Sequence, residues 1–128
     1  MTRLYNEMRD HHFAWSVRKD TLIAAFYVKE LVLFFKYRMI NNSFPGVELY
    51  NCTSEPAYTL QRICEAMRKE TDMYSHIPLI PGRPYPERLM TSQNISGKKL
   101  AASGYEFRYT LESSFRDWFN DCAWKGLC

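Results

Sequence analysis

The stretch that decides the fold reads Thr21-Leu-Ile-Ala-Ala-Phe-Tyr-Val28, followed by Lys29-Glu-Leu-Val-Leu-Phe-Phe-Lys-Tyr-Arg-Met39. The first part is almost continuously apolar and ends in aromatic and β-branched residues, which is typical of a strand buried on both faces. The second part repeats apolar residues at helical spacing and predicts a helix with a wide apolar stripe. A buried strand that runs directly into a helix favours an α/β fold.

The elements on either side of this stretch alternate in the same way. Residues Thr2–Arg9 predict a helix with Thr2 as a candidate N-cap, and Val47–Asn51 predicts a second short strand. Thr59 is a suitable N-cap for a helix that extends to about Thr71. The alternation of strands and helices predicts parallel pairing of some strands.

The second half of the chain begins with a proline-rich segment. Prolines at 78, 81, 84 and 86 exclude a regular helix there, and Ile77–Ile80 predicts a brief strand before them. A short helix is expected at Gly97–Ala102, with Gly104 in the left-handed conformation after its end. Thr110 is expected to cap a last helix that reaches about Cys122.

Length and composition limit the possible classes of protein. The chain has 128 residues, of which 46% are hydrophobic and 16% aromatic, so a disordered chain is excluded. We expect one domain, residues 1–128, of the α/β (α+β) class, with short, partly parallel strands packed by four to five helices. A net charge of +3 is too small to indicate a nucleic-acid partner. No membrane span or signal peptide is found, so we expect a cytoplasmic protein.

The familiar catalytic and metal-binding motifs are missing. The cysteines form no C-x-x-C pair, which favours free thiols over a zinc site. The five glycines are too far apart for a phosphate-binding loop. His11-His12 is interpreted as a surface turn rather than a catalytic pair. The residues alone therefore give no nucleophile with its base.

Three stretches, in order, carry a family resemblance. They are Phe26-Tyr27-Val28-Lys29-Glu30-Leu31-Val32; then Glu48-Leu49-Tyr50-Asn51 with Glu55-Pro56-Ala57-Tyr58-Thr59; then Asn94-Ile95-Ser96, Lys99-Leu100, Ser103-Gly104-Tyr105, Tyr109-Thr110-Leu111-Glu112 and Arg116-Asp117-Trp118. Between about Thr21 and Trp118 they resemble the C-terminal part of an extended short-chain dehydrogenase/reductase. This superfamily contains the NAD-dependent nucleotide-sugar epimerases and dehydratases. Glu30 stands where the family usually has Asp.

The resemblance implies that the catalytic half of such a protein is not in this chain. The family's glycine-rich dinucleotide loop and its Tyr-x-x-x-Lys pair would lie upstream, and no tyrosine here has Lys four positions later. The chain is therefore expected to be a substrate-binding lobe without its Rossmann lobe, a truncated or isolated domain that binds no NAD and catalyses no epimerisation alone.

The same resemblance suggests which residues hold a nucleoside-diphosphate sugar. Arg88 best matches the family's phosphate-contacting arginine, and Arg83 is a neighbouring candidate; a guanidinium pairs two phosphate oxygens at once. A solvated loop charge is the alternative interpretation of both. Asn94 and Ser96 are candidates for ribose contacts or for a turn. Residues 22–25 lack the basic residue that the family often has there, which weakens or abolishes the expected affinity.

Two other interpretations remain open. In the first, the chain is an interaction module that pairs two copies through the surface that the lost lobe would cover, with a patch of Phe34, Phe35, Trp118 and Trp124. Aromatic residues beside Lys98, Lys99 and Arg108 offer a single-strand nucleic-acid site, which the small net charge disfavours.

Overall fold

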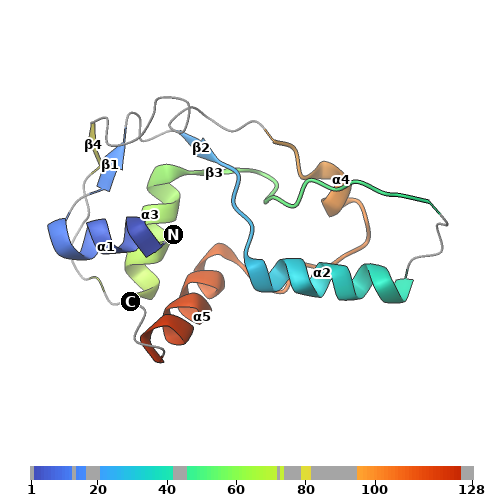
Figure 1. Ribbon diagram of the computed structural model, residues 1–128. Coiled ribbons are helices and arrows are strands. Elements are labelled where there is room, and N and C mark those ends of the chain that lie inside the picture. Colours follow the sequence, from blue (N-terminus) through green and yellow to red (C-terminus); the bar gives the residue numbers. More distant parts are fainter. Residues whose placement is uncertain are drawn as a thin grey trace.

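The computed structural model describes residues 2–12, 14–16, 21–41, 46–71, 73, 79–81 and 95–124. The elements in chain order are α1 (Thr2–His11), β1 (Ala14–Ser16), β2 (Leu22–Ile23), α2 (Val28–Asn41), β3 (Tyr58–Thr59), α3 (Leu60–Glu70), β4 (Leu79–Pro81), α4 (Lys98–Ala101) and α5 (Leu111–Trp124). In Figure 1, α1, α3 and α5 gather at one end of the molecule, while α2 and α4 lie at the other. The mixture of helices and short strands confirms the predicted α/β class.

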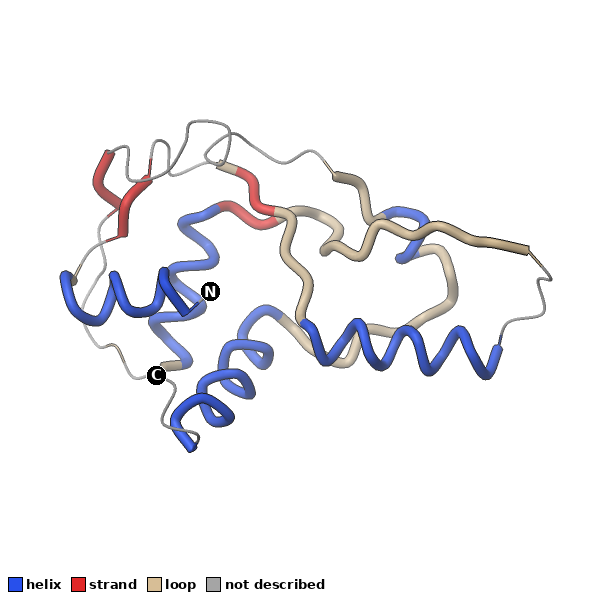
Figure 2. Tube along the Cα trace, viewed as in Figure 1, coloured by secondary structure: helices blue, strands red, loops and turns tan. Residues whose placement is uncertain are grey.

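The strands form two small sheets. β1 pairs with β4 in parallel, with Ala14 opposite Leu79, and β2 pairs with β3 in antiparallel fashion, with Leu22 opposite Thr59. The expectation of partly parallel strands is therefore confirmed. Figure 2 shows how short these strands are beside the helices and loops. Of the strand expected at 77–80, residues 77–78 lie outside the described residues.

Two of the strand predictions are wrong in extent or in kind. The buried strand expected over Thr21–Val28 is reduced to Leu22–Ile23, and the side chain of Leu22 is exposed. Residues Val47–Asn51 form no strand at all. Among the described residues no strand pairs with this segment, and β2 has only the two residues of β3 beside it. A strand needs such a partner for its backbone hydrogen bonds.

The helix ends agree with the local sequence. Thr59 caps α3, since its hydroxyl oxygen accepts a hydrogen bond from the backbone N–H of Arg62 (3.1 Å). Thr110 does the same for α5 through the N–H of Ser113 (3.1 Å). Gly104 has φ 81° just after α4, the left-handed conformation that glycine adopts at low cost. These caps were correctly predicted.

Two hydrophobic clusters hold the helices together. The first joins α1, α3 and α5 and contains the buried residues Tyr5, Met8, Ile63, Cys64, Ala66, Met67 and Phe115. The second joins α2 to α4 and the following loop through Phe34, Leu100 and Tyr105. The rings of Phe34 and Tyr105 meet edge to face. The region between the two clusters is where the candidate site lies.

Candidate functional site

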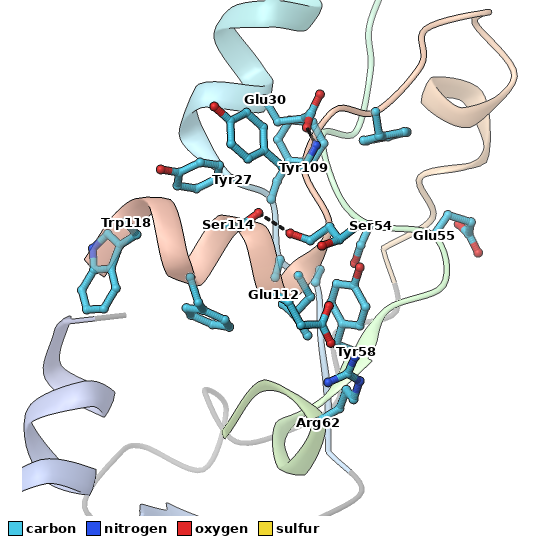
Figure 3. Close-up of a pocket in the computed structure, with 17 residues that line it drawn as sticks. Tyr27, Glu30, Ser54, Glu55, Tyr58, Arg62, Tyr109, Glu112, Ser114 and Trp118 are labelled. Carbon is cyan, nitrogen blue, oxygen red and sulfur yellow. Dashed lines mark hydrogen bonds and ion pairs between the residues drawn. The ribbon is translucent and has the colours of Figure 1, made fainter. Parts of the chain in front are cut away.

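A cavity of about 600 Å³ opens between residues 24–27, residues 54–58 and the first turns of α5 (Figure 3). Its wall is rich in aromatic side chains: Phe26, Tyr27, Tyr58, Phe107, Tyr109 and Trp118. Figure 3 shows Tyr27, Tyr109 and Glu30 at one end, and Tyr58, Arg62 and Glu112 at the other. Ligand sites are usually concave and mostly apolar with a few polar groups, so this cavity is the candidate site.

Glu30 lies in the first turn of α2 and contributes to the wall, although it is only 2% exposed. Its carboxylate accepts hydrogen bonds from the backbone N–H groups of Arg108 (3.2 Å) and Tyr109 (2.8 Å), and from the Tyr105 hydroxyl. Burial, and then the bond to Glu30, raise the pKa of Tyr105, so its hydroxyl keeps its proton. Glu30 thus fastens α2 to the loop that leads into α5.

A cluster of charges fastens the other side of α2 to α5. The Tyr27 hydroxyl donates to Asp117 Oδ2 (2.5 Å), and Lys29 Nζ lies 2.6 Å from the same oxygen and 2.8 Å from Asp121 Oδ2. Burial and the bond to Asp117 raise the pKa of Tyr27, so its hydroxyl keeps its proton at neutral pH. The cluster therefore positions the cavity wall and is unsuited to proton abstraction.

The Asp117→Asn variant is expected to be less stable than the wild type near neutral pH, and to lose less stability than the wild type when the pH is lowered. Lys29, and then Tyr27, hold the pKa of Asp117 below its usual value of 3.8. A carboxyl with a lowered pKa in the folded state stabilises the fold above about pH 4, and this contribution disappears as the pH falls further. Since the pair is partly exposed, we expect a loss of about 0.5 kcal/mol near neutral pH.

Urea denaturation at neutral pH and in acid measures this contribution. The difference in unfolding free energy between the two pH values should be smaller for Asp117→Asn than for the wild type. Glu106→Gln, at an exposed position in the loop before α5, is the matched control and should leave the difference unchanged. Equal acid sensitivity of Asp117→Asn and the wild type would contradict a stabilising role for this cluster.

The opposite end of the cavity carries an ion pair. The Arg62 guanidinium pairs with Glu112 in the first turn of α5, and this hydrogen bond is the main reason why the pKa of Glu112 is lowered. Glu55 lines the cavity and accepts hydrogen bonds from the Gly97 N–H (2.8 Å) and the Ser96 hydroxyl (3.3 Å). Ser54 Oγ is buried and has no hydrogen-bond partner.

The residues predicted to hold a sugar nucleotide either do not line this cavity or lie outside the residues that the structure describes. Arg83, Arg88 and Asn94 are outside the described residues. Ser96 is exposed; its hydroxyl donates to Glu55 and accepts from the Lys98 N–H (3.3 Å) at the start of α4. These contacts favour the turn interpretation of Ser96.

Sequence reasoning missed the cavity residues as a site. Tyr27, Glu30, Tyr109 and Glu112 stand inside the motifs that carry the family resemblance, but no site role was predicted for them. Nothing in the spacing along the chain indicates that residues 27, 58 and 109 meet. The family motifs that contain these residues were the signal in the sequence that could have indicated a site.

An exposed apolar surface runs along α2 on the side away from Phe34. Val28, Val32, Phe35, Met39 and Ile40 are all exposed on this helix. Val47 and Leu49, in the segment that follows it, are exposed as well. The prediction that Phe34, Phe35, Trp118 and Trp124 form one exposed patch is wrong, because these residues are not all exposed. Phe34 is buried at 2% exposed, Trp118 packs against the first cluster, and the side chain of Trp124 is outside the description.

The cysteines give no reactive site in the described part of the chain. Cys64 and Cys122 are buried and Cys52 is half-buried, all as free thiols, as predicted. Burial raises the pKa of Cys64 to about 12, so it is protonated at neutral pH and a poor nucleophile. Across the described ranges, no three His, Cys, Asp or Glu side chains converge as metal ligands.

Two further findings bear on the class of protein. Within the ranges that the structure covers, no helix combines the length and apolar character needed to cross a membrane. In comparisons with known proteins, no protein-family model and no curated protein matches this sequence.

Proposed function

We propose that this chain is the nucleotide-sugar-binding lobe of an NAD-dependent epimerase/dehydratase-like protein, and that it is not catalytic alone. The observation that carries the proposal is the exposed apolar surface of α2. Exposed patches of this kind usually mark a surface that another protein or domain covers. Together with the sequence resemblance, this surface supports a two-lobe protein of which the chain is one lobe.

The segment after α2 supports the same conclusion. Val47 and Leu49 are 91% and 80% exposed and alternate with the more buried Glu48 and Tyr50. This alternation is typical of a strand whose apolar face is meant to be covered. Among the described residues no strand pairs with the segment. Glu48 and Tyr50 face α2 through Arg38 and Phe34, so a neighbouring strand supplied by a partner would cover Val47 and Leu49 on the other side of the segment.

The cavity does not fit the diphosphate of NAD. Arg62 is the cation on its wall within the described residues, and it already pairs with Glu112. Glu30 and Glu55 add negative charge to the same wall. A dinucleotide would meet repulsion rather than the paired donors that phosphate requires. We therefore assign no step that involves NAD to this chain.

Calorimetric titration with UDP- and GDP-sugars tests the proposal. Weak binding is expected, and Arg88→Ala is expected to weaken it about tenfold because the forked guanidinium pairs with two phosphate oxygens. Lys36→Ala, an exposed site on α2, is the control and should bind like the wild type. NAD should give no heat, and no sugar should turn over. Turnover by the chain alone would contradict the missing-lobe argument, and failure of every sugar nucleotide to bind would contradict the binding role.

The exposed side of α2 also favours a second candidate, in which the chain pairs with a copy of itself. Val32, Phe35 and Met39 contact water on this helix face. An apolar surface that covers them lowers the free energy, because it removes these side chains from water. Sedimentation in the presence and absence of sugar nucleotide separates the two candidates. A compact monomer that binds nucleotide supports the lobe, and a tight dimer indifferent to nucleotide supports the self-associating module.

A further inference from the structure

The wall of the aromatic cavity carries more negative than positive charge. Arg62 and Glu112 neutralise each other at one end. Glu55 is held by an N–H and a hydroxyl, and no cation pairs with it in the described residues. Outside the lining, next to Tyr27, Asp117 and Asp121 share the single ammonium of Lys29. The remaining groups therefore favour a positive charge in the cavity.

Glu30 is the buried carboxylate among the acidic residues that line the cavity. It is 2% exposed, and its partners are two backbone N–H groups and the Tyr105 hydroxyl. In the described part of the chain no Lys or Arg forms an ion pair with it. Water screens a buried carboxylate poorly, so its interaction with a neighbouring ligand is stronger than that of a carboxylate at the surface.

The aromatic rings offer the second half of a cation site. Tyr27 and Tyr109 lie beside Glu30 with ring centroids 5.0 Å apart and planes at 70°, and Phe26 meets Phe107 at 6.0 Å and 79°. Edge-to-face pairs turn the electron-rich face of one ring toward the edge of the other and leave further faces for a ligand. Ring faces attract organic cations, most strongly where water is excluded.

We propose that this cavity binds a small organic cation, such as a quaternary ammonium or an N-alkylated pyridinium, between its aromatic rings and beside Glu30. The volume of about 600 Å³ is in the range of small-molecule sites. Ser54 Oγ, which is buried on the same wall without a partner, is available to hydrogen-bond a polar group of the ligand. The proposal is independent of the sugar-nucleotide role, because phosphate is disfavoured at this wall.

NMR titration of the full chain with choline and with its uncharged carbon analogue tests the charge requirement. The two probes have the same shape and differ in one positive charge. Choline is expected to bind about fivefold or more tightly, with shifts at residues 26–30 and 107–110 and weaker binding at high salt. Equal binding of both probes would overturn the proposal. So would tighter binding of UMP in this cavity, which would indicate a phosphate site.

Two variants test whether residues of the cavity wall cause the preference for choline over its uncharged analogue. Glu30→Gln keeps the shape and an oxygen acceptor but removes the charge, and it should reduce choline affinity about fivefold or more. Tyr109→Leu removes one ring and should weaken choline more than the uncharged analogue. Lys36→Gln is the distant control. If Glu30→Gln proves unstable, Glu55→Gln removes another negative charge from the cavity wall at an exposed position. Unchanged choline affinity in both this variant and Tyr109→Leu would refute the site.

Discussion

Replacing Glu30 by alanine is expected to lower the free energy of unfolding by about 3 kcal/mol, because it leaves one buried and two partly buried donors without an acceptor. The backbone N–H groups of Arg108 and Tyr109 and the Tyr105 hydroxyl all donate to this carboxylate. Glu30 is 2% exposed, so water does not replace it without rearrangement. Urea denaturation followed by circular dichroism measures the loss.

Glu30→Gln and Glu106→Ala are the matched controls. Glutamine retains one carbonyl acceptor in the same position, so we expect it to lose less than alanine does. Glu106 is exposed in the same loop, and its replacement should change the free energy of unfolding by less than about 0.5 kcal/mol. If alanine at 30 and at 106 had the same small effect, the Glu30 contacts would contribute nothing to the fold.

The same contacts explain why the cavity has a defined shape. Glu30 ties the first turn of α2 to residues 108–109, and Lys29 and Tyr27 tie it to α5 through Asp117. Residue 109 precedes Thr110, which caps α5. The aromatic wall is therefore held from both ends by polar contacts, while the two hydrophobic clusters on either side hold the helices. A loss of either polar tie should loosen the cavity before it unfolds the chain.

Features that depend on neighbours along the chain were predicted from sequence. The caps at Thr59 and Thr110 and the left-handed Gly104 depend on hydrogen bonds and torsions within a few residues. The helices that follow these caps begin where the sequence indicates. Local chemistry is sufficient for such features because nothing distant competes with it.

The extent of two strands, which depends on a partner strand, was not predicted. The apolar pattern at 21–28 and at 47–51 indicates that these side chains suit a covered strand, and it does not say whether a second strand is present. Of residues 21–28 and 47–51, only Leu22–Ile23 pair with another strand, which is β3. The same limit applies to the cavity, because its wall combines three segments that are far apart in sequence.

Phe34 and Phe35 are adjacent in sequence and are expected to respond very differently to alanine. Phe34 is 2% exposed and packs edge to face against Tyr50 and Tyr105, whereas Phe35 is 57% exposed. Phe34→Ala should lower the free energy of unfolding by about 4 kcal/mol, because it leaves a cavity in the second cluster. Phe35→Ala should cost less than about 1 kcal/mol. Urea denaturation of both variants measures the difference.

The variant at Phe35 also separates folding from association. If the exposed side of α2 meets a partner lobe or a second copy, Phe35→Asp should abolish that association while the chain stays folded, since the side chain already faces water. Sedimentation and circular dichroism report the two properties independently. A large loss of stability in Phe35→Ala would mean that this side chain packs inside the chain, and the exposed surface on which the two-lobe proposal depends would not exist.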